Sequence, residues 1–258
     1  MIKKYILINI IVIIILILIA VKVYYTYSFT PTKEELIIPY NPDNIISKIN
    51  YNLYPNGFII EQISKDPKVY YLHNFLTEKE ANHMIELCEK YKEESTVTIA
   101  DENGVSFGIN KKYRTSLTAY LKKGQTKKVM KIEKRAINLA QVDYEQLDPF
   151  QVLVYKNNEY VVPHLDTFLP NSKDVLERGN RLCTIFPYLS TLSSEEGGCT
   201  NFVKLNIKIQ PKKCDAIYFE NLIDGKIDDR LLHEGQMVTG TNKKYAINIW
   251  IREKNIKT

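Results

Sequence analysis

The longest apolar run of the chain stands near its beginning, from Tyr5 to Val21, where Asn9 is the only polar residue. A helix of these residues would rise about 25 Å, close to the ~30 Å thickness of the hydrocarbon core of a bilayer. Two lysines precede the run and one follows it, which favours a cytoplasmic N-terminus. The pattern predicts a cytoplasmic tail over residues 1–4 and a transmembrane signal anchor over residues 5–21.

A cleaved signal peptide and a buried core helix are the two other interpretations of this run. The apolar part of a signal peptide is normally about 7–15 residues long and ends at a small-x-small cleavage site. Ala20-Val21-Lys22 does not supply such a site, so we favour an uncleaved anchor. We therefore expect a single-pass membrane protein whose remaining residues lie in the lumen of the secretory pathway (endoplasmic reticulum) or outside the cell.

The residues after the anchor divide into a stalk and one domain. Residues 22–50 have no sustained periodicity and contain Pro31, Pro39 and Pro42, which predicts a stalk. From Tyr51 onward the composition is that of a globular protein, and no strong linker interrupts it. The sequence therefore predicts a single domain over residues 51–258.

Two amphipathic helices are predicted in the first part of this domain. The segment Thr77-Glu78-Lys79-Glu80 matches a capping box, and apolar residues follow it at helical spacing. A second helix is predicted over residues 126–141, because the apolar residues between Val129 and Leu139 share one face.

After Pro149 the pattern changes to short runs rich in β-branched and aromatic residues, with turn residues between them. Five strands are predicted, at Gln151–Tyr155, Arg181–Leu189, Thr200–Val203, Ala216–Glu220 and Tyr245–Arg252. Helices followed by strands predict an α+β domain with a β-sandwich or jelly-roll core.

The composition agrees with a globular protein. Of the 258 residues, 45% are apolar and 25% are charged, which argues against a disordered or collagen-like chain. The net charge is +5, and two of the positive charges are the lysines before the anchor. Residues 111–135 hold ten basic residues and one acidic residue, a pattern that also occurs in nucleic-acid-binding proteins. Because the anchor would separate the domain from nucleic acid, we expect no nucleic-acid partner.

The chain contains four cysteines, at Cys88, Cys183, Cys199 and Cys214. They are too few and too scattered for a disulfide scaffold, and the absence of a CxxC pair argues against a cysteine zinc site. In an oxidising lumen Cys183 and Cys199 could form a bridge, and buried free thiols are the alternative.

Candidate metal chemistry lies in the strand-rich half. In His164-Leu165-Asp166 the imidazole and the carboxylate point to the same side if the segment is extended. A second histidine, His233, follows in the same half. Two histidines and one carboxylate form the facial triad of non-haem Fe(II) oxygenases, which leaves coordination positions open for reactants. A zinc site with the same ligands, or a turn aspartate beside a surface histidine, are the alternatives.

Further segments match a known family in order along the chain. They are Asp66-Pro67-Lys68-Val69, His73-Asn74-Phe75-Leu76, Arg114-Thr115-Ser116, Lys131–Arg135, Tyr155–Asp166, Arg181–Leu189, Glu195–Thr200, Pro211–Ala216, and His233-Glu234-Gly235 with Trp250 and Glu253 after it. Residues 155–166 follow the pattern Y-x-x-G-x-Y-x-x-x-H-x-D, with Asn158 in place of the glycine. Asparagine tolerates a left-handed turn, so the departure is small. Together these segments resemble the prolyl 4-hydroxylase family of Fe(II)- and 2-oxoglutarate-dependent dioxygenases.

The resemblance implies a double-stranded β-helix (jelly-roll) core over about residues 147–253, with flanking N-terminal helices, and roles for individual residues. His164, Asp166 and His233 would be the iron ligands, while Tyr155 and Thr200 would contact the C5 carboxylate of 2-oxoglutarate. The family also places a lysine at that carboxylate. A lysine ten residues after His233, the second histidine of the triad, would be Lys243. A lysine six residues before Trp250 would be Lys244. We favour Lys244, because the alternation of side chains along a strand fixes the spacing between the lysine and the tryptophan. The loop between the histidine and the strand can vary in length more easily.

The implied reaction is the hydroxylation of peptidyl proline to 4-hydroxyproline in proline-rich or collagen-like polypeptides. It consumes O2 and 2-oxoglutarate at Fe(2+), releases succinate and CO2, and uses L-ascorbate to restore oxidised iron. Arg114, Arg181 and Trp250 match the family's peptide groove, although Arg114 could also be a surface charge. Alternatives are a dioxygenase of the same fold that acts on peptidyl lysine or nucleic acid, and a non-catalytic binding protein. A partner subunit cannot be recognised in the sequence.

Overall fold

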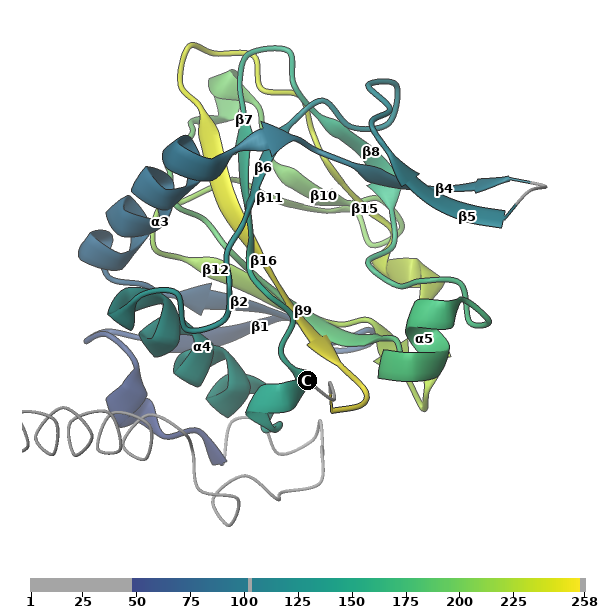
Figure 1. Ribbon diagram of the computed structural model, residues 1–258. Coiled ribbons are helices and arrows are strands. Elements are labelled where there is room, and N and C mark those ends of the chain that lie inside the picture. Colours follow the sequence, from purple (N-terminus) through teal and green to yellow (C-terminus); the bar gives the residue numbers. More distant parts are fainter. Residues whose placement is uncertain (1–47, 102–103, 256–258) are drawn as a thin grey trace, which may run out of the picture. The chain divides into compact units, whose positions relative to one another are not determined.

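An eight-stranded and a four-stranded antiparallel sheet form the core of the computed structural model, which describes residues 48–101 and 104–255 (Figure 1). The larger sheet consists, in spatial order, of β1 (Ile59–Ser64), β2 (Val69–His73), β12 (Ala216–Glu220), β9 (Arg181–Pro187), β16 (Lys244–Arg252), β7 (Gln151–Tyr155), β6 (Leu117–Tyr120) and β3 (Glu93–Glu94). The smaller sheet consists of β11 (Ile207–Ile209), β10 (Thr200–Phe202), β15 (His233–Gly235) and β8 (Val161–His164).

Two further pairs of strands form separate hairpins. They are β4 (Val97–Asp101) with β5 (Gly104–Gly108), and β13 (Leu222–Ile223) with β14 (Lys226–Ile227). Short 3-10 helices occur at Tyr51–Leu53, Tyr144–Gln146, Ser194–Glu196 and Asp229–Leu231. All described residues belong to one unit of the chain.

The helices α3 (Glu78–Tyr91) and α4 (Lys127–Ala140) pack against the larger sheet, where α3 contacts β6 and β7 and α4 contacts β16 (Figure 1). Thr77 caps α3 through the predicted capping box with Glu80. Thr126 caps α4, and Gln141 ends it in a left-handed conformation. Both predicted helices are thus confirmed. A third, short helix, α5 (Lys173–Arg178), was not predicted.

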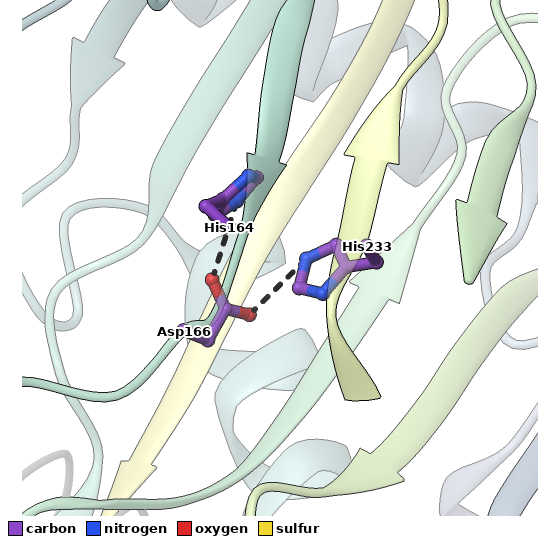
Figure 2. Close-up of side chains that lie close together, drawn as sticks. All are labelled: His164, Asp166 and His233. Atoms are coloured by element: carbon purple, nitrogen blue, oxygen red, sulfur yellow. Dashed lines mark ion pairs between the residues drawn. The ribbon is translucent and has the colours of Figure 1, made fainter. Parts of the chain in front are cut away.

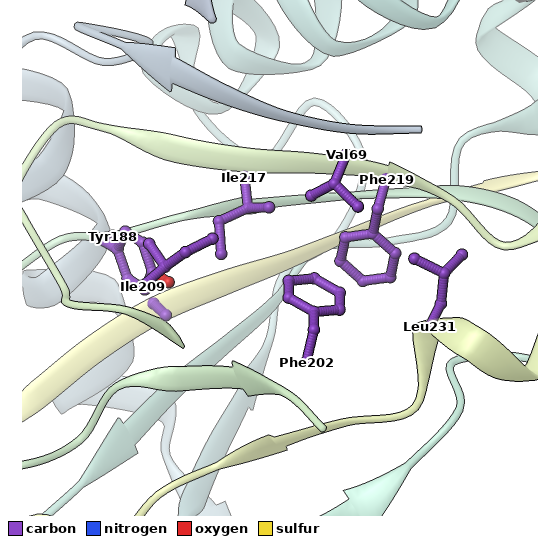
Figure 3. Close-up of a cluster of buried hydrophobic side chains, with 8 residues drawn as sticks. Val69, Tyr188, Phe202, Ile209, Ile217, Phe219 and Leu231 are labelled. Carbon is purple, nitrogen blue, oxygen red and sulfur yellow. The ribbon is translucent and has the colours of Figure 1, made fainter. Parts of the chain in front are cut away.

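The two sheets are held together by a cluster of buried side chains that come from both of them (Figure 3). Its members are Val69, Tyr188, Phe202, Ile209, Ile217, Phe219, Leu231 and Ala246. Full burial of a large apolar side chain stabilises the fold by ~1.5–3 kcal/mol. The rings of Phe202 and Phe219 meet edge to face at 5.2 Å, and both also contact the ring of His233. The packed core therefore extends to one of the candidate metal ligands.

The five strands predicted from the sequence are present, although β9 ends at Pro187 and β10 at Phe202, each shorter than expected. The mainly antiparallel core fits a jelly roll. The strands β8 and β15 were not predicted, because Pro163 interrupts the first and the second consists of only His233-Glu234-Gly235. All four cysteines are buried free thiols, so Cys183 and Cys199 are not bridged.

The predicted anchor over residues 5–21 and most of the predicted stalk lie outside the described residues. Within residues 48–101 and 104–255 no helix has the length and apolar character needed to cross a bilayer.

Candidate active site

Three candidate metal ligands meet where β8 and β15 pair. His164 ends β8, His233 begins β15, and the two residues lie opposite each other in the antiparallel register. Asp166 follows β8 in a bend. Its Oδ1 lies 3.8 Å from Nε2 of His164 and its Oδ2 lies 3.9 Å from Nε2 of His233 (Figure 2). One ligand atom from each residue falls within 4.8 Å of the others, a geometry that can hold a single cation.

Each imidazole is oriented by a backbone carbonyl. Nδ1 of His164 lies 2.9 Å from the oxygen of Val162, and Nδ1 of His233 lies 2.9 Å from the oxygen of Leu231. Because a carbonyl oxygen only accepts, the neutral ring carries its hydrogen on Nδ1 and leaves a lone pair on Nε2. Such hydrogen bonds fix the tautomer of metal-binding histidines. Both Nε2 atoms are therefore prepared to bind a cation.

The carboxylate of Asp166 is 5% exposed and is oriented by a chain of polar side chains. Oγ1 of Thr184 donates to Oδ2 of Asp166 at 2.7 Å, and Nδ2 of Asn221 donates to Oγ1 of Thr184 at 2.9 Å. No role was assigned to Thr184 or Asn221 from the sequence. Thr184 lies within the segment Arg181–Leu189 that resembles the family, and its signal is a polar residue in the middle of a predicted buried strand.

The charges at this cluster favour cation binding at neutral pH. Burial acts to raise the pKa of Asp166, but His233, His164, Arg181 and the hydrogen bond from Thr184 together lower this pKa overall. Burial, and to a smaller extent the neighbouring ring of His233, lower the pKa of His164 to about 4. The side chain of His164 is 38% exposed, so part of this residue is still in contact with solvent. An ionised carboxylate beside a neutral imidazole is the donor set that fits Fe(II).

The cluster faces a cavity of about 780 Å³, and its lining includes residues of both sheets. Lys244, the first residue of β16, lines this cavity with only 1% of its surface exposed. Its Nζ lies 5.5–5.8 Å from the ring centroids of Tyr155, Phe186 and Tyr188. Burial lowers the pKa of Lys244 to about 8. An ammonium among aromatic rings is a suitable partner for a buried carboxylate.

Two further residues make this end of the cavity suitable for a carboxylate. Oη of Tyr188 donates to Oγ1 of Thr200 at 2.8 Å, which leaves the hydroxyl hydrogen of Thr200 free to donate. A Cβ atom on Gly235 would lie 3.8 Å from Nζ of Lys244 and 4.0 Å from Oη of Tyr155. A glycine at this position therefore keeps open the space in front of the lysine.

Lys243, the alternative to Lys244, lies elsewhere. Its side chain is 41% exposed, and Nζ lies 3.4 Å from Oε1 of Glu89 on α3. Of the two lysines that the resemblance left open, the structure places Lys244 in the cavity and Lys243 on the helix side of the sheet.

The predicted groove residues Arg114, Arg181 and Trp250 also line the cavity. The guanidinium of Arg181 stacks 3.3 Å from the ring centroid of Trp250 and 4.4 Å from that of Phe168. Nε1 of Trp250 is buried and has no hydrogen-bond partner among the described residues. Arg114 is half-buried, and its Nε donates to Oγ of Ser116 at 2.9 Å. All three side chains are therefore close enough to the cavity to contact a bound molecule.

Comparison with known proteins supports this description. Residues 150–252 match the model of the 2OG-Fe(II) oxygenase superfamily. The chain is 31% identical to probable prolyl 4-hydroxylase 10 of Arabidopsis thaliana over 77% of this chain and 73% of that protein. It is 32% identical to prolyl 4-hydroxylase 5 of the same plant over 71% of this chain and 68% of that protein.

Solved structures give the same result. The 2OG complex of the viral collagen prolyl hydroxylase vCPH from Paramecium Bursaria Chlorella virus-1 has a TM-score of 0.56 and 25% identity. The match covers 71% of this chain and 95% of that one. A Pseudomonas putida prolyl-4-hydroxylase has a TM-score of 0.50, covers 72% and 93% of the two chains, and supports the fold alone at 13% identity.

Proposed function

Because this chain belongs to the prolyl 4-hydroxylase family of 2OG-Fe(II) oxygenases, we propose that it hydroxylates proline residues of a proline-rich or collagen-like polypeptide. The observation that carries the proposal is the cavity between the His164–Asp166–His233 cluster and Lys244. A cavity of about 780 Å³ is large enough for a small cosubstrate together with part of a peptide. The product is 4-hydroxyproline.

His164, Asp166 and His233 would hold the iron. The carbonyls behind the imidazoles and the hydroxyl of Thr184 fix the three ligands before the metal arrives. When bound, Fe(II) with 2-oxoglutarate and O2 supplies the oxidising power: one oxygen atom goes to proline and the other to succinate, and CO2 leaves.

The far carboxylate of 2-oxoglutarate would lie against Lys244, with the hydroxyls of Thr200 and Tyr155 as further donors. A buried carboxylate requires a paired charge and hydrogen-bond donors, and this end of the cavity offers both. Tyr188 would orient Thr200 toward the cosubstrate. These contacts would hold the far end of the keto acid and leave its other end for the iron site.

The peptide would enter the cavity, whose lining includes Arg114, Arg181 and Trp250 together with the exposed residues Tyr113 and Tyr120. Aromatic walls suit the polyproline II conformation, because such a peptide is already ordered and loses little entropy on binding. Not all of the basic residues between 111 and 135 are exposed, which weakens the case for a nucleic-acid substrate. Arg135, for example, is buried in an ion pair with Glu80.

The proposal includes a location and a reductant. The apolar run over residues 5–21 supports a single-pass anchor, with a cytoplasmic N-terminus and the catalytic domain in the lumen or outside the cell. L-ascorbate would restore iron that is oxidised in turnovers without peptide.

The proposed function is tested with the full-length protein in detergent, Fe(II), ascorbate and 2-oxoglutarate, in parallel with three substrates. These are a proline-rich peptide, a lysine-containing collagen-like peptide whose prolines are replaced by alanine, and methylated DNA. Succinate should form in excess of the peptide-free control only with the first substrate, and mass spectrometry should locate an added oxygen atom on proline. Succinate that forms only with the lysine peptide or only with DNA would show that the protein has a different substrate.

A further inference from the structure

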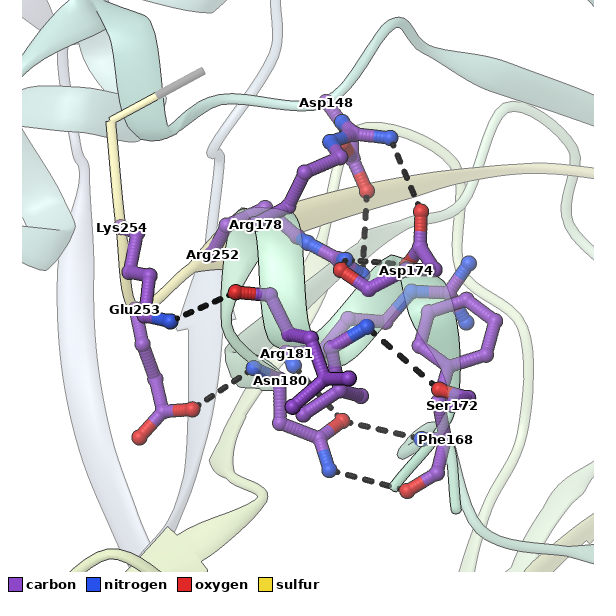
Figure 4. Close-up of polar contacts among 12 residues, drawn as sticks. Asp148, Phe168, Ser172, Asp174, Arg178, Asn180, Arg181, Arg252, Glu253 and Lys254 are labelled. Atoms are coloured by element: carbon purple, nitrogen blue, oxygen red, sulfur yellow. Dashed lines mark hydrogen bonds and ion pairs between the residues drawn. The ribbon is translucent and has the colours of Figure 1, made fainter. Parts of the chain in front are cut away.

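The bend that carries Asp166 is not part of a strand, so its position depends on contacts from elsewhere. The carbonyl oxygen of Asp166 accepts a hydrogen bond from Nη1 of Arg181 at 2.9 Å. Two residues further on, the backbone of Phe168 is held by the side chain of Asn180 (Figure 4). The first contact comes from Arg181, the first residue of β9, and the second from Asn180, which lies between α5 and β9.

The side-chain amide of Asn180 hydrogen-bonds to both backbone polar groups of Phe168. Its Oδ1 accepts from the backbone N–H of Phe168 at 2.9 Å, and its Nδ2 donates to the carbonyl oxygen of Phe168 at 3.0 Å. The side chain thereby replaces the two hydrogen bonds that a neighbouring strand would supply. Asn180 is only 5% exposed, so these bonds compete little with water.

The backbone of Asn180 is itself tied to the end of the central strand β16. Its N–H donates to Oε2 of Glu253 at 2.6 Å, and its carbonyl oxygen accepts from the N–H of Glu253 at 3.0 Å. Glu253 directly follows β16, which carries Lys244 and Trp250. The close approach requires Gly179, because a Cβ atom there would lie 2.6 Å from Cβ of Glu253, and its φ is +70°.

We propose that Asn180 is a positioning residue for the iron ligand Asp166. Through Phe168 it ties the bend to β16, so that the carboxylate is held relative to the strand that bears Lys244. This inference rests on the proposed function, since it assumes that Asp166 binds iron. Asn180 would contact neither iron nor substrate, and it would act by keeping the third ligand in place. Residues that orient metal ligands typically contribute 10–100-fold to metal affinity.

The test compares metal affinity in Asn180→Ala and Asn138→Ala. Asn138 on α4 is the matched control, because its amide oxygen accepts two hydrogen bonds, from the N–H of Asn50 and from Oη of Tyr54. The amide oxygen of Asn180 likewise accepts two, from the N–H groups of Phe168 and Arg181, whereas Asn138 is not among the residues that line the cavity. Co(II) is titrated anaerobically into the full-length protein, and its visible absorption reports coordination without turnover. Asn180→Ala should weaken Co(II) binding by about 10–100-fold, while Asn138→Ala should leave it within about twofold of wild type.

Two further readouts separate positioning from general destabilisation. At saturating iron, the KM of Asn180→Ala for 2-oxoglutarate should be unchanged, and raising the iron concentration should restore its kcat. If Asn180→Ala does not fold, Glu253→Ala, which keeps the amide but removes one anchor of its backbone, should show weaker Co(II) binding. Wild-type Co(II) affinity in the folded Asn180→Ala, or in Glu253→Ala where only that variant folds, would overturn the inference. Failure of the wild-type protein to bind Co(II) would instead contradict the proposed function.

Discussion

His164 and His233 lie directly opposite each other in the pairing of β8 with β15, and their ring centroids are 4.6 Å apart. The two residues are far apart in the sequence, so only the antiparallel register of these two short strands brings their imidazoles together. Thr200 on β10 also pairs with Gly235 on β15, which places the candidate cosubstrate site on the same small sheet. The smaller sheet thus joins the candidate metal and 2-oxoglutarate sites.

Replacement of Thr184 by valine should weaken the iron site without changing its shape. Valine keeps the volume of the side chain but removes the donor to Oδ2 of Asp166. We expect metal affinity to fall by about 10–100-fold, as measured by Co(II) titration. Thr118→Val is the matched control, because Thr118 is a buried threonine on β6 that hydrogen-bonds to Ser95. An equal loss of Co(II) affinity in both variants would contradict the role assigned to Thr184.

Replacement of Lys244 by methionine should raise the KM for 2-oxoglutarate strongly. Loss of one partner of a buried charge pair costs about 2–5 kcal/mol, which corresponds to a ~30- to 5,000-fold increase. Lys243→Met should leave the KM within about twofold of wild type, because Lys243 faces Glu89 outside the cavity. Steady-state kinetics with varied 2-oxoglutarate measures both values. A strongly raised KM in Lys243→Met and an unchanged KM in Lys244→Met would show instead that Lys243 binds the carboxylate of 2-oxoglutarate.

The affinity for 2-oxoglutarate should fall as the pH rises above about 8. The pKa of Lys244 is lowered by burial from 10.5 to about 8, so the positive charge needed by the carboxylate is present below pH 8 and lost above it. In the cosubstrate-free protein the contribution to stability has the opposite sign. Between pH 8 and 10.5 the unfolded chain binds more protons than the folded one, so this lysine adds stability as the pH rises.

The measurement is the KM for 2-oxoglutarate of the wild type and of Lys244→Met across this pH range. The wild-type KM should increase with pH, and the KM of the variant should be high and nearly independent of pH. An alkaline increase of the same size in Lys244→Met would mean that another group titrates.

Replacement of Glu80 by glutamine should destabilise the fold without affecting the site. Oε1 of Glu80 lies 3.1 Å from Nη2 of Arg135, and both side chains are buried between α3 and α4. Removing one charge leaves the guanidinium without its counterion, which typically costs about 3–5 kcal/mol in the free energy of unfolding. Urea denaturation measures this change. Lys173→Gln, which removes an exposed i,i+4 partner of Glu177, should cost less than about 1 kcal/mol.

Local signals predicted the two long helices and five strands after Pro149 well, but they did not predict α5 or the strands β1 to β6. The capping box at Thr77 and the apolar face of α4 depend on neighbouring residues only, and β7 and β12 have the predicted bounds. The strands β8 and β15 carry the two histidines but are short and irregular, so their own sequences do not indicate them. Their pairing is a tertiary effect, and a pattern along the chain does not encode it.

The candidate site was predicted in part, and the reasons are similar. His164 and Asp166 stand in a recognisable motif, whereas His233 was indicated only by its place in the strand-rich half until the family resemblance supported it as a ligand. The spacing from Trp250 favoured Lys244, and the structure has Lys244 among the residues that line the cavity. The orienting residues Thr184 and Asn180 act through contacts between distant segments, and no spacing rule identifies them.

The most direct test of the proposed function is turnover of a proline-rich peptide under oxygen-18 gas, with succinate and hydroxyproline counted in the same sample. The proposed reaction predicts equal amounts of the two products, with label from the gas in both, and neither product above background in His164→Ala. Peptide-stimulated succinate without hydroxyproline, or hydroxyproline formed equally well by His164→Ala, would contradict it.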